Sequence, residues 1–149
     1  MAGSRGIVTQ AGISLTGGAA MTVLQMVAAA DQKVELIELD FGFNGTVNTN
    51  EPVRIQVYRQ TTAGTMSAAT VVKANDSDGD SFRTTAQHTA TVEPTSTDRL
   101  RLWRCHPQQG LIYQKHDQAP LIIGAGDRIG FVVLAQDDVD VDVTCCFEE

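Results

Sequence analysis

The sequence predicts an all-β protein, an antiparallel β-sandwich, on three observations. From Val34 onward, runs rich in valine, isoleucine, threonine and aromatic residues are separated by Gly, Pro, Asn and Asp, a composition typical of strands joined by turns. Several runs alternate apolar and polar residues, as strands with one buried face do. Helical periodicity is nearly absent. The predicted strands span residues 23–29, 33–43, 53–60, 71–73, 86–92, 100–105, 111–114, 121–123, 128–135 and 139–147.

The segment MAGSRGIVTQAGISLTGG precedes the predicted strands. It is rich in Gly, Ser and Thr and carries only scattered apolar residues, so we expect it not to pack in the core. We predict a flexible N-terminal arm over residues 1–18 that becomes ordered against a partner. Residues 19–149 then form a single β-sandwich domain, since a chain of 149 residues is long enough to bury one core.

The segment GGAAMTVLQMVAAADQK is the place where a helix competes with a strand. Ala, Leu, Met and Gln are good helix formers, so a short helix over residues 19–30 is the alternative. We favour the strand over residues 23–29.

Two runs show the alternation of a half-buried strand clearly. In VRIQVYRQ, the side chains of Val53, Ile55 and Val57 fall on one face, opposite arginine, glutamine and tyrosine. In VDVDVTCCF, every second residue from Val139 to Phe147 is apolar, and the intervening residues are mostly polar. Each strand is expected to place one face in the core and the other in solvent.

The run RIGFVVLA is apolar on both faces. Ile129, Phe131 and Val133 lie on one side, and Val132 and Leu134 lie on the other. Both faces must be covered, either by a second layer of this chain or by a neighbouring subunit. Val132 and Leu134 are therefore candidate subunit-interface residues.

The stretch DRLRLWRCHPQQGL is the most distinctive polar and aromatic segment. Arg99, Arg101 and Trp103 alternate onto one face, opposite two leucines. Arginine and tryptophan dominate the hot spots of protein interfaces, so this face is a possible subunit interface. Equally, a β-bulge would flip the register and turn Trp103 into a core anchor, and alternation alone does not decide between the two.

The glycines of GAGDRIG suggest a phosphate-binding loop at first sight. Their spacing, G-x-G-x-x-x-G, is one residue too long for the dinucleotide fingerprint, and a β-branched run follows where a helix is required. We predict a tight turn between strands instead, in which Gly124 and Gly126 supply positive φ and Asp127 caps the backbone.

No metal or cofactor is predicted. Asp76, Asp78 and Asp80 in NDSDGD offer oxygen ligands for calcium, but the EF-hand register places Ala74 first and Thr85 twelfth, so a solvated acidic loop is expected. The three histidines lack the spacing that would bring two imidazoles to one metal. These are His88, His106 and His116.

The sequence gives no sign of an enzyme. Cys105 and His106 are neighbours on a predicted strand, so their side chains point to opposite faces and cannot share a proton. Neither a serine-nucleophile elbow nor a recognisable pair of acid and base carboxylates is present. We therefore predict no catalytic residue.

Charge and hydropathy limit the partners. A net charge of -7 argues against nucleic-acid binding, which needs clustered Lys and Arg. A membrane span needs about 20 apolar residues, and none of the apolar runs approaches that length. The cysteines are odd in number and two are adjacent, Cys145 and Cys146, so we expect all three to be reduced. The segment MAGSRGIVTQ lacks the uninterrupted apolar core of a signal peptide, so we expect the chain to be made in the cytoplasm.

The order of several segments resembles a known family. ELIELDFGFNGT, EPVRIQVYRQTTAGT, VEPT, LWRCHPQQGL and PLIIGAGDRIGFVVLA, followed by a terminal CFEE, are similar to small β-sandwich proteins encoded among the structural genes of tailed phages. The resemblance covers about residues 22–149. The chain thus resembles the capsid decoration, or cement, proteins. This resemblance implies a jelly-roll-like sandwich that trimerises and lies on the outer surface of the phage head.

On this hypothesis the chain is a virion structural protein whose partner is the major capsid protein, and the N-terminal arm contacts the capsid. Apolar residues on a flexible segment have nowhere else to be buried. The candidate contact residues in the arm are Arg5, Ile7, Val8, Ile13 and Leu15. A tail or baseplate component would show the same features.

The alternative from a different class is a carbohydrate-binding module. β-Sandwiches often present aromatic platforms to sugars, and Trp103, Tyr58 and Tyr113 are available. Only 5% of the residues are aromatic, and most of these lie on strands that also need them for the core.

Overall fold

The computed structural model describes residues 3–44, 51–75 and 81–149. This part of the chain is built of strands and contains no helix, so the predicted all-β fold is confirmed. None of the described residues forms a helix that could cross a membrane. The strands are β1 (Arg5–Leu15), β2 (Ala20–Val27), β3 (Val34–Asn44), β4 (Val53–Gln60), β5 (Thr65–Ala69), β6 (Val71–Lys73), β7 (Thr85–Val92), β8 (Ser96–Cys105), β9 (Leu111–Gln114), β10 (Leu121–Ile123), β11 (Arg128–Leu134) and β12 (Val139–Glu148).

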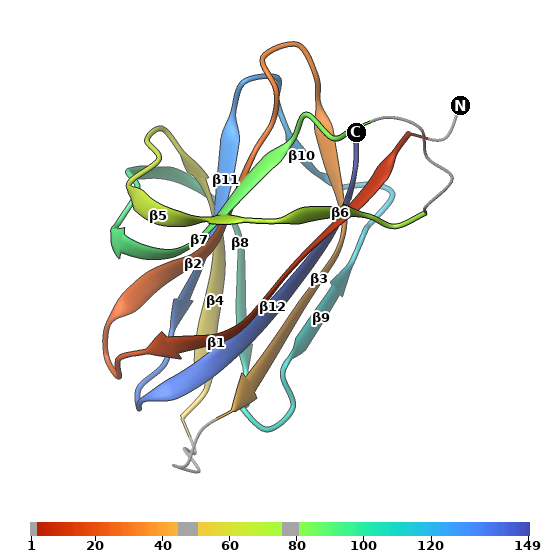
Figure 1. Cartoon of the computed structure of the whole chain (residues 1–149). Coiled ribbons are helices and arrows are strands. Elements are labelled where there is room, and N and C mark those ends of the chain that lie inside the picture. Colours follow the sequence, from red (N-terminus) through yellow and green to blue (C-terminus); the bar gives the residue numbers. More distant parts are fainter. Residues whose placement is uncertain (1–2, 45–50, 76–80) are drawn as a thin grey trace.

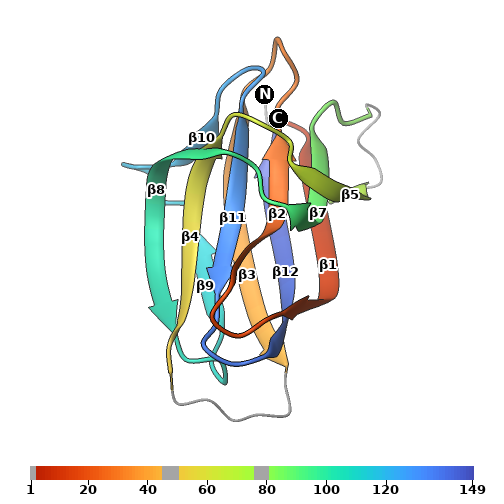
Figure 2. The ribbon, with the colours of Figure 1, turned by 90° about the vertical axis from the view of Figure 1, so that its left-hand side faces the viewer.

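The strands form two antiparallel sheets that pack face to face (Figures 1 and 2). Sheet A has the order β10-β3-β12-β1-β6, and β9 also pairs with β3. Sheet B has the order β5-β7-β2-β11-β4-β8, and Figure 2 looks onto it from β8 at one edge to β5 at the other. The predicted antiparallel sandwich is therefore confirmed.

The connections make the sandwich a jelly roll. From β1 to β4, and again from β8 to β12, the chain crosses between the sheets, so β1-β12-β3 with β9 and β10 faces β2-β11-β4-β8. Two interlocked Greek keys of this kind define the jelly roll. The segment from β5 to β7 is an addition to that frame. β5 and β6 run on as one ribbon that leaves sheet B and joins sheet A (Figure 1).

The core lies between the two sheets and takes the alternate residues that the sequence predicts. From Val139 to Phe147, every second side chain of β12 is buried. Phe131 of β11 meets Phe41 of β3 across the core, edge to face, with ring centroids 6.4 Å apart. Edge-to-face pairs suit the quadrupoles of both rings.

The predicted N-terminal arm is wrong for the described part of residues 1–18. β1 lies in sheet A between β12 and β6, and Val8, Ile13 and Leu15 are at most 3% exposed. The pairing of β1 with β12 shifts between Gln10 and Ile13. This bulge breaks the period of two, so the apolar residues look scattered along the sequence although all three reach the core.

The other local predictions are mostly confirmed. Residues 20–27 form a strand and not the alternative helix. The glycine stretch is a turn, in which the Asp127 amide donates to the Gly124 carbonyl at 3.0 Å and Gly126 has a φ of 76°. Positive φ at Gly124 is not seen, so that detail was wrong. Asp76, Asp78 and Asp80 lie outside the described residues.

Candidate interaction surfaces

The five residues expected on the arm divide into two groups. Val8, Ile13 and Leu15 are core residues of this chain and are not available to a partner, which corrects the prediction for them. Arg5 keeps an exposed side chain, whose Nε donates to Glu148 Oε2 at 3.0 Å. Ile7 is half-buried on the outer face of sheet A.

A bulge in β8 decides between the two predictions for Trp103. Val57 pairs with Arg101 and Tyr58 with Arg99, which leaves Leu100 as the extra residue. Directly paired residues point to the same side of a sheet. Arg99 therefore faces outward, whereas Arg101 and Trp103 face inward opposite buried residues of β4. The prediction that Arg99, Arg101 and Trp103 share one face is wrong, and the bulge alternative is confirmed.

Trp103 closes the edge of the sandwich between β8 and β9. Its ring lies 5.4 Å from that of Tyr113, centroid to centroid, and both side chains pack against the core. Arg101 is held beside it, since its guanidinium donates to the carbonyls of Leu100 at 2.8 Å and Ala119 at 2.6 Å. These two residues stabilise the edge of this chain's own fold.

The aromatic residues considered for sugar binding do not form one platform. Trp103 and Tyr113 pack together at the inner edge of the sandwich. Tyr58 lies on the opposite, outer face of sheet B, where its hydroxyl accepts a hydrogen bond from Gln56 Nε2 at 3.1 Å. Within the described ranges, no group of three or more His, Cys, Asp or Glu side chains is arranged to hold a metal ion.

One half of the outer face of sheet B is covered by this chain itself. Gln25 Nε2 donates to Gln60 Oε1 at 2.7 Å, and Gln60 Nε2 donates to Thr22 Oγ1 at 3.2 Å. Glu93 accepts from the Thr22 hydroxyl at 2.6 Å and closes this polar layer. A Cβ on Gly130 would collide with the Gln60 amide. The second face of β11 is thus covered here by a layer of this chain, one of the two expected ways.

The other half, over β8, β4 and the end of β11, is open and positively charged. These three strands carry six arginines and one carboxylate, Asp98. We call the outward-facing residues here the basic face. They are Arg54, Gln56, Tyr58, Arg99, Leu102, Arg104, Val132 and Leu134.

The basic face holds like charges together. Arg54 of β4 is paired directly with Arg104 of β8. The Arg54 Nε atom is buried without a hydrogen-bond partner. Within residues 3–44, 51–75 and 81–149, neither arginine forms a salt bridge, and nor does Arg99. Leu102 lies among them with 43% of its surface exposed.

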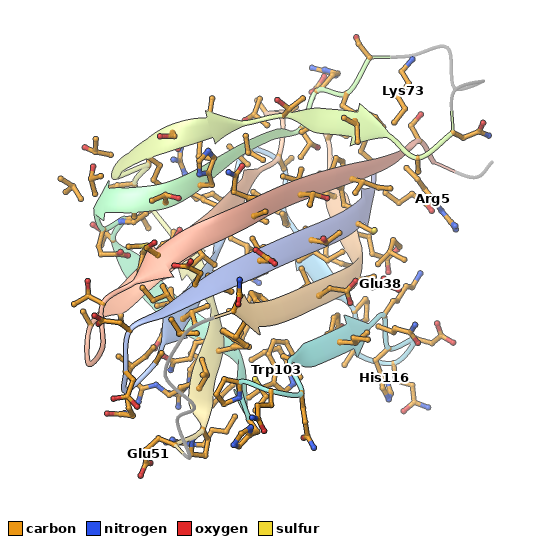
Figure 3. All side chains as sticks on the ribbon, turned by 60° about the horizontal axis from the view of Figure 1, so that its bottom comes forward. Arg5, Glu38, Glu51, Lys73, Trp103 and His116 are labelled. Carbon is orange, nitrogen blue, oxygen red and sulfur yellow. The ribbon has the colours of Figure 1, made fainter. Side chains whose placement is uncertain are left out.

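The outer face of sheet A has the opposite charge. Its two central strands, β3 and β12, carry six carboxylates and no lysine or arginine. Figure 3 looks onto this face, with Glu38 on β3 and Arg5 at the end of β1. We call the six carboxylates the acidic face. They are Glu35, Glu38, Asp40, Asp140, Asp142 and Glu148.

Cations neutralise the acidic face at one end only. Glu148 is bridged by Arg5, and Glu35 by Lys115, each at 3.0 Å. Asp140 and Asp142 accept hydrogen bonds from the Ser14 hydroxyl and the Gly12 amide, both at 2.7 Å. In the described residues, no salt bridge reaches Asp140, Asp142, Glu38 or Asp40.

The carboxylates crowd one another near the middle of the face. Burial and the neighbouring Glu38 raise the pKa of Asp40 above its usual value, and Asp40 Oδ1 is buried without a hydrogen-bond partner. Burial raises the pKa of the Cys146 thiol next to them, with further contributions from Glu38 and Asp40. Beside Cys146, a hollow of about 210 Å³ is lined by Ile7 and Ile37.

Comparison with known proteins adds no relative. The chain matches no family model, no curated protein and no solved structure. The fold and the two faces define a jelly-roll sandwich with oppositely charged outer surfaces.

Sequence reasoning missed both faces as units. As candidates it named Arg99, Val132, Leu134 and, for sugar binding, Tyr58 from the basic face, but none of the acidic face. A count of charges on each predicted strand would have shown the contrast, because 33–43 carries three acids and one lysine and 139–147 only acids, whereas 53–60 carries only arginines. The sequence alone does not show which strands lie side by side, because that is determined by pairing between segments far apart in the chain.

Proposed function

We propose that the chain is a virion structural protein, a decoration protein that trimerises and binds the major capsid protein on the outer surface of a phage head. The jelly-roll strand order is the observation that carries this proposal. Viral capsid proteins are one of the groups built on this fold, together with lectins and cupins. The segments that resemble the decoration proteins lie largely on strands of that frame, including β3, β4, β8 and β11.

The surfaces favour a binding role over the other uses of the fold. The described residues form two broad charged faces, one on the outer side of each sheet. Broad charged faces serve association with a partner rather than catalysis. The aromatic residues that a sugar site would need are split between the two sides of sheet B. We therefore prefer the structural role to the carbohydrate-binding module.

The contact with the capsid has to be assigned differently from the arm hypothesis. Three of its five residues are buried in the core, so only Arg5 and Ile7 remain as candidates from that set. Both lie on the outer side of β1, next to the acidic face. A folded surface of this kind binds without the cost of ordering a flexible segment.

The test is co-sedimentation of the purified chain with heads assembled without it from the major capsid protein of the same phage genome. We expect saturable binding with a copy number that is a multiple of three. Bovine serum albumin at the same concentration controls for trapping. A chain that stays in the supernatant at every concentration contradicts the proposal, and binding to purified tails alone favours the tail component.

A further inference from the structure

We propose that copies of this chain associate head to tail, with the acidic face of one copy docked on the basic face of the next. The contact goes beyond the proposed function and does not rest on it. It is argued from the charges, the unpaired polar atoms and the placement of the two faces.

The charges of the two faces are complementary. The acidic face holds six carboxylates, of which Glu35 and Glu148 are bridged by cations. The basic face holds three outward-facing arginines, none of which forms a salt bridge within the described residues: Arg54, Arg99 and Arg104. Opposite potentials steer two surfaces together and select against wrong partners. The chain is acidic overall, with a net charge of -7, so such a basic face is not a consequence of composition.

Each face also holds a buried polar atom without a partner, and the two atoms match. Asp40 Oδ1 on the acidic face is an acceptor, and Arg54 Nε on the basic face is a donor. A buried polar group without a hydrogen bond costs stability. Docking brings carboxylates toward guanidinium groups, the pairing that arginine makes best.

Apolar surface is present on both sides of the proposed contact. Leu102 is the exposed large hydrophobic residue of the basic face, at 43%. On sheet A, the hollow lined by Ile7 and Ile37 lies beside Glu38 and Cys146. A stable interface combines apolar contact at its centre with polar contact around it, and both ingredients are present here.

The placement of the faces on different sheets fixes the kind of contact. A two-fold dimer would lay one face on its own copy, which would put carboxylate against carboxylate or arginine against arginine. A head-to-tail contact pairs opposite charges at every interface. Such contacts close into a ring when the two faces are inclined to each other, and grow into a filament when they are opposed. Because the two faces lie on opposite outer sides of one sandwich, this contact stacks the copies along one direction.

The experiment reverses each face separately and then both together. The acidic-face variant carries Glu38→Lys and Asp142→Lys, and the basic-face variant carries Arg99→Glu and Arg104→Glu. All four side chains lie on outward positions. Association is measured by native mass spectrometry and analytical ultracentrifugation at ionic strengths of about 0.01 M and about 0.15 M, since surface charge is screened by salt.

We expect the wild-type chain to associate. Each variant alone should associate more weakly, with a dissociation constant at least tenfold higher than that of the wild type. A mixture of the two variants should form hetero-complexes, because each supplies the intact face that the other lacks. The chain with all four substitutions should associate again, which a loss of folding would not allow. Asp117→Lys with Asp137→Lys, two exposed acids in turns, is the charge-matched control for the acidic-face variant. Lys33→Glu, a single reversal at an exposed lysine, is the control for each single substitution of the basic face.

Three results would overturn the inference: a monomeric wild type at both ionic strengths, a face variant that associates like the wild type, or basic-face binding of an oligonucleotide without self-association. Growth into longer assemblies as the concentration rises supports the head-to-tail contact. Because no heads are present, the outcome is independent of the co-sedimentation result, so the two proposals can fail separately.

Discussion

The two outer faces of the sandwich differ far more than the two inner ones. Both sheets turn valine, isoleucine, leucine and phenylalanine toward the core, whereas outside one sheet is lined by carboxylates and the other by arginines. The fold constrains the inner positions, because they must fill a common core. Outer positions tolerate most polar residues, so a consistent sign over several strands points to a role in contact.

Both faces carry charge arrangements that work against the isolated chain. On sheet B, Arg54 and Arg104 are directly opposed, and on sheet A the Asp40 and Glu38 carboxylates crowd each other. Like charges directly across a ladder are destabilising. Arrangements that cost stability without a benefit inside the molecule are expected where function depends on them.

The largest effect should come from placing a charge on the inner side of β1. Val8→Asp puts a carboxylate where the side chain has no exposure, and we expect it to cost about 4 kcal/mol or more, enough to unfold much of the protein. The matched change Ile7→Asp, one residue away on the outer side, should cost about 1 kcal/mol or less. Urea unfolding followed by circular dichroism measures both, and equal losses would mean that β1 is not seated in sheet A.

A second comparison uses one glycine on the outer side of each sheet. A Cβ on Gly130 of β11 collides with the Gln60 amide, whereas a Cβ on Gly42 of β3 meets nothing within 4 Å. Gly130→Ala should therefore cost about 1–3 kcal/mol, by displacing the buried Gln60 from its hydrogen bonds with Gln25 and Thr22. Gly42→Ala should be neutral or slightly stabilising.

Denaturant unfolding measures the change in unfolding free energy for both glycine variants. Combining Gly130→Ala with Gln60→Ala should recover part of the loss, because the truncated side chain no longer occupies the space of the new methyl group. Additive losses in this double-mutant cycle would show that Gln60 does not lie over β11.

The sequence predicted the strands that an apolar pattern marks and missed β1 and β5. β3, β4 and β12 show a clear period of two over most of their length. β1 was not predicted because its bulge places the buried residues Val8 and Ile13 at an odd offset of five positions, which breaks the period of two. β5 was not predicted because Thr65–Ala69 consists mainly of small or polar residues and is mostly exposed, so no hydrophobic pattern marks it as a strand.

The candidate surfaces were harder to predict than the strands. Whether Trp103 faces the core depends on the bulge at Leu100, and the position of a bulge is set by the packing of β8 on β4. The basic face joins arginines of β4 and β8, which are far apart in the sequence. The charged residues can be read from the local sequence. The order in which the strands pair, which places these residues on one face, depends on the whole fold.

A smaller effect is expected from reversing one charge of the basic face. Arg104→Glu converts the pair with Arg54 from repulsive to attractive, so the isolated chain should gain about 0.2–1 kcal/mol in unfolding free energy. Arg99→Glu is the control, since Arg99 is opposite Tyr58 and gains no partner. Urea unfolding at concentrations where the protein is monomeric measures both. A loss of stability for Arg104→Glu would remove the argument that this pair is retained for association.

The smallest effect concerns the crowded carboxylate of the acidic face. Because the pKa of Asp40 is raised on folding, mainly by burial and by Glu38, the native state binds its proton more tightly than the unfolded chain. Stability should then fall as the pH rises above the usual aspartate value of 3.8. Asp40→Asn should raise the melting temperature slightly at pH 7, and the gain should disappear below that value.

The control for Asp40→Asn is a carboxylate whose pKa shifts the other way. The Arg83 guanidinium lowers the pKa of Asp31, so Asp31→Asn should lower the melting temperature at pH 7, by little because the pair is exposed to solvent. Thermal unfolding of both variants between pH 3 and pH 7 distinguishes the two signs. If Asp40→Asn lowers the melting temperature at pH 7, Asp40 is stabilised within the isolated chain, and its buried oxygen does not need a partner from a second copy.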